Sequence, residues 1–241
     1  MAGFFYKLGR MVGPQLRKAD WLYRSLTGTE AEAIRAEFAV GRDLARAVVQ
    51  QLEIDPEPAA GHLLEGVPAR LGACLTNRQW QFTFRAVRGA EVNAFALPGG
   101  FVFVTRPLLE FCRWDPDEAA FVLGHEMAHV VLRHAINRLM ASSAVRAALS
   151  RLNPAGGVLR QPIAGLAATL LNQGYSQDQE LEADRLAVRL ARAAGFDAAA
   201  AARLLARLCA LSGDPSVPGS YFSSHPPLEV RLGQVNRAPR A

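Results

Sequence analysis

Val122-Leu-Gly-His125-Glu126-Met-Ala-His129-Val-Val131 is the stretch that decides the fold of this chain. Nearly all of it is apolar, which predicts a buried helix that carries His-Glu-x-x-His. Residues four apart share one face of a helix, so His125 and His129 can present two imidazoles to one metal ion. Glu126 lies beside the first of them, where it can act as a base on a metal-bound water without ligating the metal. Burying two histidines and a glutamate is costly unless they are paired or metal-bound, which argues against a purely structural role.

The sequence also indicates where this helix begins and ends. Asp115 is a good N-cap, and Pro116 suits the first helical position. We expect the helix to continue to about Met140. His134 follows His129 by five residues, which turns it well off the ligand face of a continuous helix, so we expect it to be structural.

A catalytic zinc site needs a third protein ligand and an open position for water. The segment Gln177–Arg185 offers this ligand, because Glu180 and Asp184 are four residues apart and share a helix face. Glu180 can ligate the metal, while Asp184 accepts a hydrogen bond from the distal N–H of a ligand histidine. The alternative is a solvated acidic face to which Asp178 and Glu182 also belong. Glu182 points about 200° away from Glu180 on a helix. Separate substitutions of Glu180 and Glu182 therefore distinguish a metal ligand from a solvated acidic face.

A small sheet is predicted directly before the motif helix. Trp80–Val87 alternates apolar and polar residues, the period of a half-buried strand. Val92–Leu97 and Phe101–Thr105 are separated by Pro98-Gly-Gly100, which predicts two further strands around a turn. Together with the helices, these strands predict an α+β fold, mainly helical, with a small antiparallel or mixed sheet.

Charge and cysteine content exclude several classes of protein. The net charge of +5 is concentrated in residues 1–28, and the remaining chain is nearly neutral, so no nucleic-acid-binding surface is expected. Cys74, Cys112 and Cys209 are far apart and form no CxxC pair, so neither a disulfide framework nor a cysteine metal site is predicted. We expect no signal peptide and no membrane-spanning segment, and therefore a cytoplasmic location.

Residues 4–26 mix aromatic and aliphatic residues with basic ones. One interpretation is a helix that lies on an anionic membrane surface, which would make the protein peripheral to the membrane. The other is an N-terminal helix that packs on the body of the protein. We favour the second, because a basic amphipathic pattern is a weak signal. Thr29-x-x-Glu32 then forms a capping box at the start of a long helix.

Four motifs of this chain together resemble one family of enzymes: His125-Glu-Met-Ala-His129, Glu180-Leu-Glu-Ala-Asp184, Asn93–Thr105, and Ser224-His-Pro226 with Arg231. They are similar to the gluzincin metallopeptidases that include HtpX, the CAAX prenyl proteases and the BepA-like and Oma-type quality-control proteases, and most similar to the BepA/Oma-like branch. The similarity covers roughly residues 80–235. We expect neither the membrane spans of HtpX nor the helical repeats of BepA-like proteins. The resemblance implies a gluzincin metallopeptidase domain over residues 61–241, with residues 1–60 as a helical extension packed on this core.

The resemblance also implies one Zn²⁺ per chain. Its ligands would be His125, His129 and Glu180, with Glu126 as the catalytic base and Asp184 as the carboxylate that orients a ligand histidine. With these ligands the site would keep a net charge of +1, enough to bring the pKa of a bound water towards about 7. Glu126 would take the proton as the water attacks the scissile carbonyl and deliver it to the leaving amine.

Asn93, Ala94 and Phe95 are the predicted substrate-binding residues. By the resemblance, their strand is the sheet edge that lines the cleft. A substrate can be held there as an added extended strand through its backbone. A plain core hairpin is the alternative interpretation for Phe101–Thr105.

His225 and Arg231 are further candidates for the catalytic machinery. The Ser-Ser-His-Pro-Pro loop can bring His225 to the cleft, either as a transition-state donor or as a latent fourth zinc ligand. Such a histidine is a feature of the BepA-like branch. The alternative is a loop histidine with structural hydrogen bonds. Arg231, about a helix turn beyond, either assists His225 or forms an ion pair with Asp184.

The sequence therefore predicts a zinc metalloendopeptidase that hydrolyses peptide bonds of unfolded or flexible proteins, in protein quality control and gated by His225. One alternative is a zinc-binding holdase or adaptor that captures extended chains with little turnover. A zinc hydrolase of a non-peptide amide is a weaker one. The natural substrate, the oligomeric state and the role of residues 141–175 do not follow from the sequence.

Overall fold

The computed structural model describes residues 20–141, 174–211, 225 and 228–237 of the chain. Its elements follow in this order: α2 (Asp20–Thr27), α3 (Glu30–Val49), α4 (Pro58–Gly72), β1 (Thr83–Val87), β2 (Ala94–Leu97), β3 (Phe101–Thr105), α5 (Arg106–Phe111), α6 (Pro116–Val131), α7 (His134–Ala141), α10 (Gln177–Ala193), α11 (Ala199–Leu211) and α13 (Leu228–Arg237). Most of the described residues are helical and the strands form one small sheet, which confirms the predicted α+β class.

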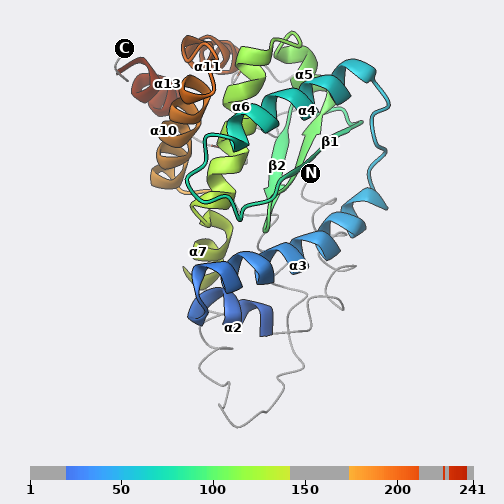
Figure 1. Cartoon of the computed structure of the whole chain (residues 1–241). Coiled ribbons are helices and arrows are strands. Elements are labelled where there is room, and N and C mark those ends of the chain that lie inside the picture. Colours follow the sequence, from blue (N-terminus) through green and yellow to red (C-terminus); the bar gives the residue numbers. More distant parts are fainter. Residues whose placement is uncertain (1–19, 142–173, 212–224, 226–227, 238–241) are drawn as a thin grey trace.

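Helix α6, which carries the His-Glu-x-x-His motif, is the central element (Figure 1). Helix α10 packs along it, and strand β2 also lies against it. The Asp115 side chain accepts a hydrogen bond from the Asp117 N–H, and Pro116 begins the helix, as predicted. Every residue from 118 to 130 is buried, as expected for a helix that is apolar on nearly all sides. The polar motif residues therefore lie inside the protein.

Small residues let α6 and α10 approach closely. A Cβ at Gly124 would lie 3.4 Å from the Cα of Ala187, which is van der Waals distance. Helix α10 begins with a capping box between Ser176 and Gln179. The close packing sets two buried carboxylates of α10 against the motif face of α6.

The sheet is mixed, with the strand order β1-β3-β2. Strand β3 pairs parallel with β1 and antiparallel with β2, so that Phe103 lies opposite both Arg85 and Phe95. In the turn between β2 and β3, Gly99 and Gly100 have φ of 76° and 95°, a conformation that glycine adopts without strain. Strand β2 is therefore at the edge of a mixed sheet, which is one of the two predicted arrangements.

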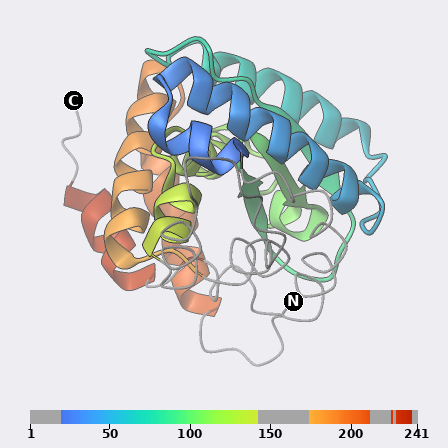
Figure 2. The same cartoon turned by 90° about the horizontal axis from the view of Figure 1, so that it is seen from below.

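Helix α3 lies against β2 and β3, and α2 packs on α3 (Figure 2). The predicted capping box is present, because the Thr29 hydroxyl accepts from the Glu32 N–H and the Glu32 carboxylate accepts from the Thr29 N–H. The predicted domain boundary between residues 60 and 61 lies in the first turn of α4. The division into an extension and a core stays a prediction.

The motif helix ends at Val131, earlier than predicted. Arg133 takes a left-handed backbone conformation with φ of 57°, which is uncommon for a residue other than glycine. Its guanidinium donates hydrogen bonds to the Glu37 carboxylate on α3 and to the Ser25 hydroxyl on α2. These tertiary contacts stabilise the turn, and a separate helix, α7, begins at His134.

Part of the predicted membrane-contact segment, residues 4–19, lies outside the described residues, as do residues 142–173. Within the described part of the chain, no helix combines the length and the apolar character needed to cross a lipid bilayer. Contact of residues 4–26 with a membrane surface stays a prediction.

Candidate metal centre

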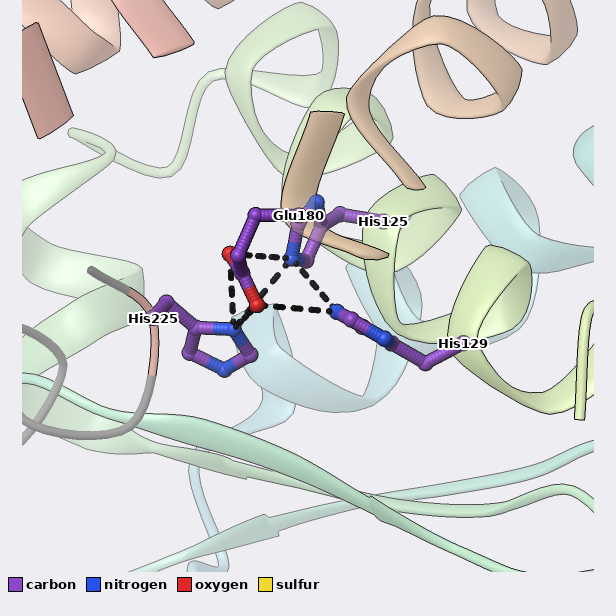
Figure 3. A group of neighbouring side chains, drawn as sticks. All are labelled: His125, His129, Glu180 and His225. Atoms are coloured by element: carbon purple, nitrogen blue, oxygen red, sulfur yellow. Dashed lines mark hydrogen bonds and ion pairs between the residues drawn. The ribbon is translucent and has the colours of Figure 1, made fainter. Parts of the chain in front are cut away.

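Four side chains point toward one another at the motif face of α6 (Figure 3). His125 and His129 come from α6, Glu180 comes from α10, and His225 precedes α13 in the chain. One donor atom from each lies within 4.8 Å of the others, and all four residues are buried. The structure thus brings together the three predicted ligands and adds His225 as a fourth donor.

Five of the distances between donor atoms are close to those of a tetrahedral zinc site. His125 Nε2 lies 3.0 Å from His129 Nε2 and 3.5 Å from Glu180 Oε2, and His129 Nε2 lies 3.4 Å from Glu180 Oε1. His225 Nδ1 lies 3.3 Å from His125 Nε2 and 3.0 Å from Glu180 Oε1. Zinc–ligand bonds of about 2.0–2.1 Å at tetrahedral angles place neighbouring donors about 3.3–3.4 Å apart. Imidazole and carboxylate donors also suit zinc, so these residues fit the ion that the family resemblance implies.

Asp184 holds His125 from the side away from the other donors. Its Oδ1 lies 2.9 Å from His125 Nδ1, which directs Nε2 at the cluster. Arg231 on α13 donates to both Asp184 oxygens at 2.8 Å and lies 3.0 Å from Glu180 Oε2. It also donates to the backbone carbonyl of His225 at 3.4 Å. Arg231 therefore forms the expected ion pair with Asp184 and also contacts the backbone of His225.

These contacts shift the pKa values of the buried groups. Burial acts to raise the pKa of Asp184, but Arg231 and His125 prevail and lower it to about 2. Burial and Arg231 act to lower the pKa of His125, but hydrogen bonds to its carboxylate partners raise it to about 9. Burial and the adjacent His125 hold the pKa of His129 well below its ordinary value. Burial opposes ionisation of Glu180, but the surrounding histidines hold its pKa far below the ordinary range, so both carboxylates carry a charge that suits a cation.

Glu126 is buried next to the donors but is not one of them. Neither of its carboxylate oxygens has a hydrogen-bond partner among the described residues. His225 Nε2 lies 3.5 Å from its Oε1. A buried carboxyl group without a partner is costly unless a bound molecule meets it. Its place beside the donors therefore fits a general base for a water held there.

Strand β2 borders the centre on the side of the sheet. The end of β2 lines a small hollow together with His129, Tyr175 and Arg133. Asn93, just before β2, is 1 % exposed, and among the described residues neither polar atom of its side chain has a hydrogen-bond partner. Its backbone forms hydrogen bonds with Thr105, the last residue of β3. Ala94 is buried and Phe95 half-buried beside it.

Two residues at this centre were not predicted from the sequence. The Tyr175 ring stacks on that of His129, with 3.8 Å between centroids and 15° between planes, and burial raises the pKa of Tyr175 to about 12. His134 Nδ1 lies 2.9 Å from His129 Nδ1, because α6 ends before His134. Tyr175 precedes the N-cap of α10 and so lies outside the helix periodicity, and no sequence signal pointed to it. For His134, the missing signal was the helix break at Arg133.

This chain is similar in sequence to known proteases. Residues 66–238 match peptidase family M48. The beta-barrel assembly-enhancing protease of Yersinia pestis is 30% identical in an alignment of 226 residues that covers 88% of this chain and 46% of that protein. The mitochondrial metalloendopeptidase OMA1 of Schizosaccharomyces pombe is 32% identical over 169 residues, 67% of this chain and 47% of that protein. The metalloprotease YcaL of Escherichia coli is 31% identical over 156 residues, 63% of this chain and 60% of that protein.

The chain spans about half the length of the first two relatives. The matched range contains all four donor residues together with Glu126 and Asp184. The resemblance predicted from the four motifs is thereby confirmed. Because the family match covers most of its length, the chain belongs to peptidase family M48.

Proposed function

We propose that this chain is a zinc-dependent endopeptidase that cleaves unfolded or flexible polypeptides. One observation carries the proposal: four metal donors converge beside the buried carboxyl group of Glu126, which has no hydrogen-bond partner among the described residues. The names of the relatives support the activity, since one is called a metalloendopeptidase and another a metalloprotease.

His125, His129 and Glu180 would hold the zinc ion. Zinc in this position supplies a Lewis acid, which polarises the scissile carbonyl and makes a water molecule acidic enough to attack it near neutral pH. Asp184 accepts the Nδ1 proton of His125, so that the lone pair of Nε2 remains available to the metal.

Glu126 is the proposed base. Its carboxylate accepts a proton from the attacking water and then delivers that proton to the amine that leaves when the peptide bond breaks. No described residue forms a hydrogen bond with either oxygen, although His225 Nε2 lies 3.5 Å from Oε1.

The edge of β2 that faces away from β3 is the proposed substrate platform. A peptide that adds to this edge as a strand is held through its backbone, so many sequences are accepted but the chain must be extended. The Asn93 carboxamide would bond the substrate backbone, with Ala94 and Phe95 bordering the bound strand. Folded proteins rarely offer an extended segment, which favours unfolded substrates and a role in protein quality control.

His225 is the proposed gate. A catalytic zinc site keeps one position open for water, whereas four protein donors close the site. His225 Nδ1 takes the fourth donor position, and its Nε2 lies 3.5 Å from Glu126 Oε1. One ring therefore occupies the space that both the water and the base need. Withdrawal of this side chain would open the fourth position and release Glu126 together.

A zinc-binding protein that captures extended chains with little turnover is the second candidate. The four-donor arrangement favours it, because a site closed in this way turns over slowly. A cytoplasmic location, with peripheral membrane contact through residues 4–26, remains a prediction.

Casein cleavage by the wild type and by Glu126→Gln separates the two candidates, measured in the native chain and again in a His225→Ala background. We expect Glu126→Gln to lose cleavage about a hundredfold or more, because the base is gone. Its zinc content should not change, since Glu126 is not a donor. Glu110→Gln, at an exposed position on α5, is the matched control and should cleave like the wild type. If the wild type and Glu126→Gln are equally inert in both backgrounds while binding peptide, the peptidase proposal fails and capture is favoured.

A further inference from the structure

The end of α6 brings another histidine to the metal centre. His134 Nδ1 lies 2.9 Å from His129 Nδ1, and His134 Nε2 lies 3.3 Å from Glu182 Oε2. The His134 ring is buried, whereas the Glu182 side chain is 52% exposed at the surface of α10. One buried ring therefore connects a metal donor to a surface carboxylate.

One arrangement of protons satisfies every atom in this series of contacts. His129 Nε2 faces the donor cluster, 3.4 Å from Glu180 Oε1, so a metal takes the lone pair of Nε2 and the ring proton stays on Nδ1. That N–H needs an acceptor, and His134 Nδ1 is in position to accept it. His134 then carries its own proton on Nε2 and donates it to the Glu182 carboxylate.

Tertiary contacts hold His134 in this place. The preceding residue, Arg133, is in the left-handed conformation and donates to the Glu37 carboxylate at 2.6 and 2.8 Å. Gln179 Nε2 donates to the backbone carbonyl of His134 at 3.4 Å. The imidazole is thus presented to His129 by contacts from α3 and α10, and not by the periodicity of the motif helix.

We propose that His134 is a positioning residue for the metal ligand His129. By accepting the Nδ1 proton, it fixes both the tautomer and the ring orientation of His129, and Glu182 holds His134 in turn. His125 has a direct carboxylate partner in Asp184, so the two ligand histidines are oriented by different means. The proposal rests on the proposed function, because it requires His129 to hold zinc.

Zinc affinity, measured by competition with a chromogenic chelator, tests the proposal without relying on peptidase activity. His134→Leu removes the acceptor, and we expect the dissociation constant for zinc to rise about 10- to 100-fold. His134→Asn places a carboxamide oxygen near the position of Nδ1, so it should restore most of the affinity. Glu182→Gln leaves a weaker acceptor and should give an intermediate loss. Asp178→Asn removes another exposed carboxylate of α10 and should leave zinc affinity unchanged.

Thermal unfolding of the zinc-free variants shows which of them fold. An unchanged zinc dissociation constant in His134→Leu, or equal losses in His134→Leu and His134→Asn, would overturn the positioning role. If His134→Leu does not fold, the zinc affinity of Glu182→Gln tests the proposal instead. Wild-type zinc affinity in Glu182→Gln would then count against it. Graded losses of affinity in a protein that cleaves no casein would support the role of His134 and remove the peptidase proposal instead.

Discussion

The Arg231 guanidinium donates hydrogen bonds from Nε and Nη2 to the two carboxylate oxygens of Asp184, each 2.8 Å long. Both side chains are fully buried. Asp184 in turn orients His125, and Arg231 also reaches Glu180 at 3.0 Å. One guanidinium therefore compensates two carboxylates that the metal centre needs in the ionised state.

Arg231→Met should destabilise the protein strongly. The substitution leaves Asp184 and Glu180 buried without their cation, which should lower the free energy of unfolding by about 3–5 kcal/mol. Denaturant unfolding of the zinc-free protein measures this change. Arg185→Met removes an exposed arginine of α10 and is the control. Equal unfolding midpoints for the two variants would contradict the account.

His225→Ala should raise peptidase activity severalfold, because it removes the fourth donor and clears the space beside Glu126. The value of kcat/KM on a quenched fluorescent peptide measures the change, with zinc content determined in parallel. His62→Ala, at an exposed position on α4, should leave the rate unchanged. Loss of turnover with zinc retained would instead make His225 a transition-state donor.

Asn93→Ala should raise KM about tenfold, the equivalent of one hydrogen bond to the substrate backbone. The melting temperature should not fall, since the carboxamide bonds no other described residue. Asn77→Ala, which removes a surface hydrogen bond to Glu30, is the matched control and should leave KM unchanged. A lower melting temperature with an unchanged KM would show that Asn93 is structural.

Gly41→Ala should destabilise the packing of α3 on the turn between β2 and β3. A Cβ at Gly41 would lie 1.7 Å from the backbone oxygen of Pro98, so one of the two elements must move, at a cost of about 1–3 kcal/mol. Gly66→Ala is the control, because nothing lies within 4 Å of a Cβ there and alanine favours the helix. Denaturant unfolding should shift in opposite directions for the two variants, and a shift in the same direction would contradict the packing.

Helix periodicity predicted many of the residues of the metal centre. Residues four apart on one face placed His125 with His129 and Glu180 with Asp184, and the structure brings these two pairs together. The alternation in Trp80–Val87 likewise predicted β1, and the Pro-Gly-Gly turn predicted β2 and β3. These are local patterns, which depend only on neighbours along the chain.

The end of α6 at Val131 could not be predicted from such local patterns. Arg133 is not a residue that favours a left-handed backbone, and its contacts come from Glu37 and Ser25, 96 and 108 residues away. The approach of His134 to His129 depends on that break, so it was missed. The parallel pairing of β1 with β3 is also nonlocal, since β2 lies between them in the chain.

The central claim is that His125, His129, Glu180 and His225 hold one zinc ion. Metal analysis combined with X-ray absorption at the zinc edge tests it most directly. We expect one zinc per chain, with only nitrogen and oxygen donors at about 2.0–2.1 Å, and loss of the metal from the His125→Ala/His129→Ala double variant. A zinc–sulfur distance of about 2.3 Å, or full zinc occupancy in the double variant, would contradict the account.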